Sequence, residues 1–152
     1  MLVRFLLFLV LNFAALGIGG FFTGQGVPSD WYQSLDKAPW TPPGWVFGAA
    51  WTTVMLTFSA YMAVAWDRFE SRNLILGLYL LQWVLNVAWN PVFFQMHWVG
   101  IGLVVITALA LLVWYLLLAH AEEMGLHRFW VLPYVMWLTI ATSLNAYIWM
   151  NN

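Results

Sequence analysis

The chain has 152 residues, of which 64% are hydrophobic and only 7% are charged. Because a soluble domain usually carries about 25% charged residues, this chain has too few charges to solvate a globular surface. That composition excludes a soluble enzyme, a nucleic-acid-binding protein that works through a basic patch, and a disordered tail. The absence of cysteine excludes disulfides, thiolate metal sites and thiol nucleophiles. We therefore expect an integral membrane protein.

Five apolar stretches without Asp, Glu, Lys or Arg lie between the sparse charges. Each holds roughly 18–23 residues, and about 20 are needed for a helix to cross a hydrocarbon core. Runs such as 109–113 do not alternate as barrel strands would, so we predict one all-α domain over 1–152. The predicted membrane-spanning helices are 5–22, 44–66, 74–95, 98–119 and 129–149.

The first span also has features of a signal peptide, namely Arg4, an apolar run and the small residues Ala15 and Gly17. The apolar run continues through Phe21 and Phe22 without a polar break. A retained helix is therefore the main interpretation, and a cleaved signal peptide is the alternative.

Segment 23–43 is the only long connection, and it contains Trp31, Tyr32 and Trp40. A purely solvated linker has no use for three large aromatic side chains. We therefore expect this aromatic loop to pack on the helix bundle or to line a binding site.

Two helix starts are predicted from capping residues in this loop. Ser29 is a candidate N-cap for a short helix that holds the first two aromatic residues. Thr41, Pro42 and Pro43 resemble the cap and first turn of the second span, because proline is tolerated where the N–H has no partner.

The few basic residues are unevenly distributed between the two sides of the membrane. The N-terminal side collects Arg4, Arg68, Arg72 and Arg128, whereas the other side has only Lys37. Because Lys and Arg favour the cytoplasm, we expect the N-terminus inside and the long loop outside.

Amides recur along the third span, where Gln82, Asn86 and Asn90 are spaced by four residues and share one helix face. An amide that faces lipid is costly, so this face should point inward. For Asn90 and Asn145 we prefer hydrogen bonding between helices, at about 0.6–2 kcal/mol for each bond. Pro91 should kink the helix, because it removes a hydrogen bond to the residue four positions back.

Depth in the membrane separates the twelve tryptophans into groups. Those that fit the interfacial belt are Trp31, Trp40, Trp45, Trp66, Trp98, Trp130 and Trp149. Trp83 and Trp114 lie deeper, and we expect them to pack between helices. Trp51, Trp89 and Trp137 share a leaflet with an inward amide below the aromatic loop. Flat rings with few polar groups and no charge suit a large, flat, mostly apolar ligand.

Groups for conventional catalysis are missing, since the spans contain no carboxylate pair, no nucleophile with a base and no phosphate loop. His120, Glu123 and His127 come nearest to a metal-binding set. Gly125 interrupts their helical spacing, so we interpret them as a solvated loop and predict no metal site.

Three blocks of sequence resemble the TspO/MBR family, which comprises the tryptophan-rich sensory proteins and translocator proteins, or peripheral benzodiazepine receptors. The first block is WYQSLDKAPWTPPGWVF at 31–47, followed by Trp51. The second is NVAWNPVFF at 86–94, and the third is PYVMW at 133–137 followed by ATSLN at 141–145. The resemblance covers nearly the whole chain.

This resemblance implies a five-helix bundle, often dimeric, with a ligand pocket under the first loop. Members bind porphyrins and related tetrapyrroles, and benzodiazepine-type or isoquinoline ligands, and some bind cholesterol. The positions that match the family's ligand pocket are Tyr32, Pro42, Phe47, Trp51, Asn86, Trp89, Trp137 and Ala141. Trp51 and Trp137 also match the two tryptophans tied to light- and oxygen-dependent porphyrin breakdown.

One departure concerns the family's sterol motif at the end of the fifth helix. Leu144 and Tyr147 are present, but the residues 150–152 supply no Lys or Arg, so we do not assign high-affinity cholesterol binding. Dimerisation also stays open, because Gly19 and Gly20 suit close contact either between protomers or within one bundle.

Three functions remain as hypotheses. The first is a receptor or transporter in tetrapyrrole transport, sensing or stress response, and the second is an enzyme that oxidises porphyrin through Trp51 and Trp137. The third is a regulatory membrane scaffold with an incidental pocket. We expect no required cofactor, with porphyrin as ligand or substrate. The expected partners are a flat apolar small molecule, membrane lipid and a second copy of the chain, with no nucleic acid.

Overall fold

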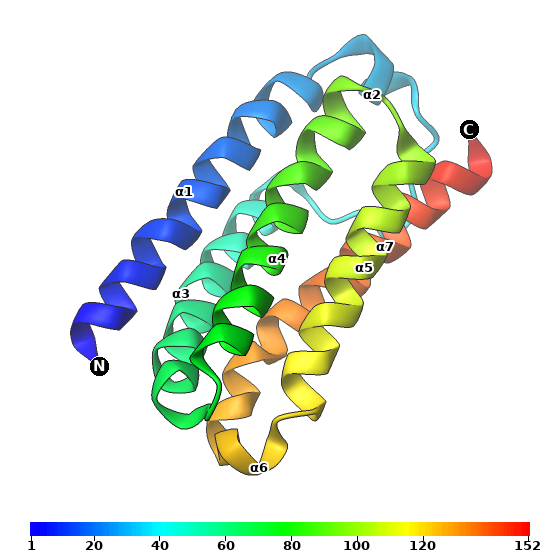
Figure 1. Cartoon of the computed structure of the whole chain (residues 1–152). Helices are drawn as coiled ribbons and strands as arrows, with labels where there is room; N and C mark the ends of the chain where they lie inside the picture. The colour runs from blue at the N-terminus through cyan, green and yellow to red at the C-terminus, as the bar shows by residue number, and fades with distance from the viewer.

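A computed structural model describes residues 1–152 as a bundle of five long helices, drawn in Figure 1. The long helices are α1 (Leu2–Gly26), α3 (Gly44–Arg68), α4 (Arg72–Asn90), α5 (Val99–Leu118) and α7 (Leu132–Asn151). The short elements are α2 (Asp30–Ser34), the π-helical turn η1 (Pro91–Gln95), α6 (Ala121–Met124) and the 3-10 helix η2 (Gly125–Val131). By length and composition, the bundle has five helical segments able to cross a membrane, so the predicted fold class is confirmed.

The boundaries of the helices differ from the predicted ones mainly at the first and last spans. Helix α1 continues to Gly26, four residues into the predicted loop, because its end packs directly against Phe94. Residues 129–131 belong to η2, and the regular helix begins only at Leu132.

A hydrogen-bonded cluster joins three helices in the half of the bundle that holds the N-terminus. The Asn12 amide donates to the Ser59 hydroxyl at 2.8 Å, and the Tyr79 hydroxyl donates to the Asn12 side-chain oxygen at 2.9 Å. The Tyr61 hydroxyl donates to the Leu116 carbonyl at 3.0 Å. Since all of these groups are buried, this half is a closed core that holds α1, α3, α4 and α5 together.

The aromatic loop packs on the other end of the bundle, as predicted. The Ser29 hydroxyl accepts from the Tyr32 N–H at 3.2 Å, which confirms it as the N-cap of α2. The Trp31 ring stacks on His97 with 3.9 Å between centroids. Further along, the Trp40 indole donates to the Ser143 hydroxyl at 3.1 Å. Trp31 also lies edge-on to Phe93 of η1, with 5.6 Å between centroids, so the loop is attached at η1, just after it at His97, and at α7.

The predicted start of the second span at residue 44 is confirmed, but the predicted cap and first turn at 41–43 are wrong. Helix α3 begins at Gly44, and its N-cap is Pro43, which has no side-chain oxygen to offer. The Thr41 hydroxyl donates to the Ala38 carbonyl at 2.7 Å, so it closes a turn inside the loop and does not cap the helix.

At Pro91, where a kink was predicted, the regular α-helical hydrogen bonding ends and a π-helical turn begins. Helix α4 stops at Asn90, and the chain continues as η1, in which the Met96 N–H donates to the Pro91 carbonyl at 2.9 Å. Because proline has no N–H, the carbonyl four residues before it loses its donor, and the wider turn follows.

Two other predictions need correction. Trp114 is 41% exposed on the outer surface of α5 and does not pack between helices, whereas the Trp83 indole donates to the Leu11 carbonyl of α1 at 3.0 Å. His120 is not solvated, since it is only 9% exposed and its ring lies 4.2 Å from that of Phe69. The hairpin end of the bundle is thus better packed than its charged sequence suggests.

Candidate functional site

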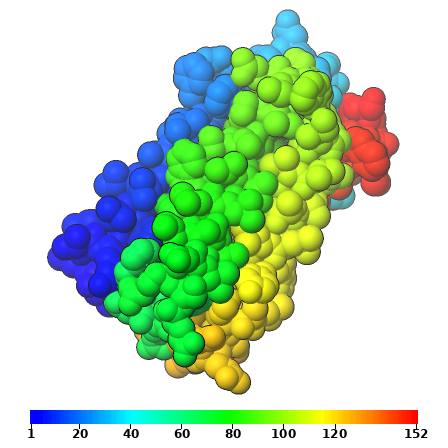
Figure 2. Space-filling model, in the orientation of Figure 1, coloured from blue at the N-terminus to red at the C-terminus, as the bar shows by residue number.

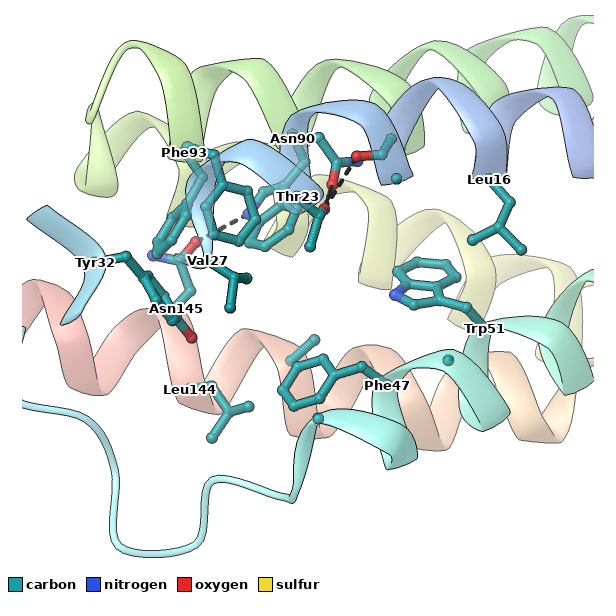
Figure 3. A pocket seen from close by; sticks show the side chains of 18 of the residues that line it. Leu16, Thr23, Val27, Tyr32, Phe47, Trp51, Asn90, Phe93, Leu144 and Asn145 are labelled. Carbon is teal, nitrogen blue, oxygen red and sulfur yellow. Dashed lines mark hydrogen bonds between the residues drawn. The ribbon is translucent and has the colours of Figure 1, made fainter. Parts of the chain in front are cut away.

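A cavity of about 760 Å³ lies under the aromatic loop, between α1, α3, α4, η1 and α7 (Figure 3). This volume is within the range of about 300–1,000 Å³ that is typical of small-molecule sites. Figure 2 shows that the side chains of α1, α4 and α5 lie against one another on one face of the bundle. The cavity residues that sequence reasoning had selected are Tyr32, Pro42, Phe47, Trp51, Asn86, Trp89 and Ala141.

Trp137 is the selected residue that does not line the cavity. It is only 5% exposed and lies behind Phe47 and Trp51, with centroid distances of 5.1 and 6.3 Å and rings nearly perpendicular. Its indole N–H is buried and has no hydrogen-bond partner. A ligand in the cavity would therefore meet Trp51 directly and Trp137 only through its neighbours.

The three amides of α4 have different surroundings, although they share one face. The Gln82 amide donates to the Tyr134 hydroxyl at 2.7 Å, and the Asn90 side-chain oxygen accepts from the Thr23 hydroxyl at 2.9 Å. Asn86 is only 6% exposed and lines the cavity, yet its side chain makes no hydrogen bond within the protein. Its donor and acceptor are both free to meet a ligand.

Trp89 is fixed in the cavity wall by contacts on its edge and its face. Its indole N–H donates to the Asn145 side-chain oxygen at 3.0 Å, and its ring stacks on Phe93 with 5.0 Å between centroids. The Asn145 amide donates in turn to the Val99 carbonyl at 3.0 Å. The predicted role of Asn90 and Asn145 in joining helices is thus confirmed.

Helix α1 supplies a wall that sequence reasoning did not assign to the site. Gly20, Thr23 and Gly24 line the cavity, and Figure 3 shows Thr23 and Val27 across the open space from Phe47 of α3. The sequence feature that could have indicated this wall is the recurrence of small residues every three or four positions along α1. Gly19 serves packing inside the bundle, since an added Cβ would lie 2.7 Å from the Asn90 amide nitrogen.

The cavity mouth is formed by the aromatic loop. Burial raises the pKa of the Tyr32 hydroxyl above its ordinary value, so this group stays neutral and keeps its proton at neutral pH. The Lys37 ammonium lies 5.0 Å from the centre of the Tyr32 ring. Lys37 is not among the predicted site residues, although it is the only Lys or Arg residue between Arg4 and Arg68.

The fold and this site define a multi-pass integral membrane protein with an aromatic cavity of small-molecule size under its first loop. The model of the TspO/MBR family matches residues 6–150, and the chain belongs to this family.

Three curated relatives have similar length and sequence. The chain is 34% identical to protein CrtK of Rhodobacter capsulatus, in an alignment covering 82% of this chain and 80% of the relative. It is 33% identical to the tryptophan-rich protein TspO of Archaeoglobus fulgidus, with 94% of each chain covered. It is 32% identical to the human translocator protein, with 87% of this chain and 79% of the relative covered. Membership and the five spans indicate a membrane protein of the receptor or transporter type.

Proposed function

We propose that the cavity binds porphyrins and other flat, mostly apolar molecules, and that the protein acts in tetrapyrrole transport, sensing or stress response. Trp51 and Trp89 offer ring surfaces to such a ligand, and aromatic faces stack favourably on flat conjugated systems. The volume of about 760 Å³ leaves room for a molecule with several rings.

The free amide of Asn86 is the observation that carries this proposal. The Asn86 side chain makes no hydrogen bond within the protein, and its amide atoms stay accessible from the cavity that it lines. Among largely apolar walls, this side chain offers one acceptor and two donors to the ring nitrogens of a tetrapyrrole or the carbonyl of another flat ligand. A bound ligand would therefore satisfy the group that the protein leaves unpaired.

Binding is tested by titrating the purified protein in lipid nanodiscs with protoporphyrin and following the quenching of tryptophan fluorescence. We expect Asn86→Ala to weaken binding by about five- to thirtyfold, the effect of losing a buried hydrogen bond. Asn151→Ala is the matched control, because Asn151 is exposed at the end of α7 and lies outside the cavity. Wild-type affinity in Asn86→Ala and Trp51→Phe together would show that the ligand binds elsewhere.

Porphyrin breakdown remains a second candidate, favoured by the ring contact between Trp51 and Trp137. In this arrangement Trp51 would meet the pigment, and Trp137 would exchange an electron only through Trp51. The test is the porphyrin absorption band under light and oxygen in the wild type, Trp51→Phe and Trp137→Phe. A band that is stable in the wild type would eliminate this candidate.

We also propose that the N-terminus is cytoplasmic and the cavity mouth faces outward. Arg4, Arg68, Arg72 and Arg128 lie at the bundle end opposite Lys37, and basic residues favour the cytoplasm. Because the chain has no cysteine, single Cys substitutions at Asp36 and Glu122 can be labelled with an impermeant thiol reagent in intact cells. Labelling of Glu122→Cys but not of Asp36→Cys would show that the protein has the opposite orientation.

A further inference from the structure

We propose that the cavity selects ligands that carry a carboxylate at one edge, and that the Lys37 ammonium at its mouth binds this carboxylate. The inference rests on the proposed ligand site and adds the chemical class of the preferred ligand, a flat amphipathic anion. In this proposal Lys37 determines ligand specificity, and it is not one of the predicted pocket residues.

Lys37 is the only charged residue that lines the cavity. It follows α2 and Leu35 in the aromatic loop, and its side chain is half-buried. The other polar residues of the lining are uncharged, namely Tyr32, Asn86 and the side chains of Thr23, Thr41, Thr52, Asn90 and Asn145. A negative charge on a bound ligand would therefore be most favourably placed beside Lys37.

The Lys37 ammonium is held in position, but its charge is not neutralised. It donates to the carbonyls of Gln33 and Leu35, both at 3.2 Å, and it lies over the Tyr32 ring at 5.0 Å. An ammonium has three donors, so two carbonyl contacts leave one donor free. Two carbonyls and one ring orient the group without supplying a negative charge.

No carboxylate of the protein pairs with Lys37. The ion pair of Arg4 with Asp67 and the contact of His120 with Glu123 at 3.6 Å both lie at the opposite end of the bundle. Asp30 and Asp36 are the nearest acidic residues in sequence, but both are exposed and neither lines the cavity.

A ligand carboxylate at the mouth would complete this arrangement. A cation beside low-dielectric walls attracts an anion more strongly than a fully solvated cation does. The apolar body of the ligand would extend below towards Trp51 and Phe47, while its carboxylate stays at the wet end of the cavity. This orientation buries the rings and leaves the charge paired.

The test compares two ligands that differ only in charge, protoporphyrin and its dimethyl ester, in nanodiscs of neutral lipid. We expect Lys37→Met to weaken binding of the diacid about tenfold and to leave binding of the diester within about twofold. Lys37→Arg should keep most of the affinity for the diacid, and added salt should weaken only the diacid. Arg72→Met is the matched control, because Arg72 also lies over an aromatic ring, that of Trp66, but outside the cavity.

The outcomes separate this inference from the function on which it rests. Equal losses for diacid and diester in Lys37→Met would mean that Lys37 only supports the loop, and would overturn the inference. Unchanged affinity for both ligands in Lys37→Met would overturn it as well, while leaving the cavity as a porphyrin site. If the wild type binds neither ligand, the proposed function fails and this inference fails with it.

Discussion

The Trp89 indole donates a hydrogen bond to the Asn145 side-chain oxygen at 3.0 Å, which joins α4 to α7 at the cavity wall. The Asn145 amide extends this link to the Val99 carbonyl at the start of α5. One buried amide therefore holds three helices in register and fixes the orientation of an aromatic wall residue. The cavity keeps its shape through such links, because few other polar contacts cross between helices at this level.

We expect Asn145→Ala to lower the free energy of unfolding by about 1–3 kcal/mol, because the Trp89 N–H and the Val99 carbonyl lose their partner in a buried setting. The measurement is the midpoint of thermal unfolding in detergent. The control is Asn151→Ala, which changes the same residue type on the same helix at an exposed position. Equal midpoints for the two variants would contradict a joining role for Asn145.

Gly26 is expected to tolerate no side chain. An added Cβ would overlap the Phe94 ring, so either the ring or the end of α1 must shift. We expect Gly26→Ala to cost about 1–3 kcal/mol of stability, as overpacking usually does. Gly17→Ala is the control on the same helix, because an added Cβ there meets no atom within 4 Å. A destabilisation shared by both variants would point to a general effect of glycine in α1.

Gly48 offers a way to fill the cavity without disturbing the fold. It lines the cavity on α3, and an added Cβ meets nothing within 4 Å. We expect Gly48→Leu to keep or raise the unfolding midpoint, since leucine favours a helix by up to about 1 kcal/mol over glycine, while porphyrin binding weakens. Gly77→Leu on α4 is the control, because Gly77 is exposed outside the cavity. Undiminished porphyrin binding in Gly48→Leu would show that the ligand does not fill the part of the cavity beside Gly48.

Trp40 is expected to hold the aromatic loop against α7. Trp40→Phe removes the hydrogen bond to Ser143 and retains a ring beside Tyr147. Losing this hydrogen bond should lower the free energy of local loop opening by about 0.5–1.5 kcal/mol. Protease cleavage within the loop should therefore become roughly two- to tenfold faster. Trp45→Phe is the matched control, since Trp45 is exposed and makes no hydrogen bond through its indole. Identical cleavage rates for the two variants would mean that the Ser143 contact does not restrain the loop.

Residue type and depth predicted Trp51, Asn86 and Trp89 as site residues, whereas Pro42 and Phe47 were predicted only through the resemblance to the family. Seven of the eight selected ligand residues line the cavity. Trp137 was selected because it shares a leaflet with Trp51 and matches the family's pocket, yet depth along a helix does not say which side chain lies in front. The prediction that Trp114 packs between helices was wrong for a related reason. Helix α5 is apolar on all sides, so its sequence does not indicate which face meets lipid.

The sequence by itself determined the number of spans, the inward face of α4 and the packing of the aromatic loop. These follow from the bilayer, which requires long apolar helices and places lone amides and exposed aromatics under strong constraint. Only the tertiary structure decided which groups are left without partners. Gln82, Asn86 and Asn90 are equivalent in sequence, but the Gln82 amide nitrogen donates to Tyr134 and the Asn90 side-chain oxygen accepts from Thr23. The buried side-chain oxygen of Gln82 has no partner, and the Asn86 side chain makes no hydrogen bond within the protein although it lines the cavity. Lys37 likewise becomes a cavity residue only because the loop folds back over the bundle, since hydrogen-bond pairing depends on contacts between distant segments.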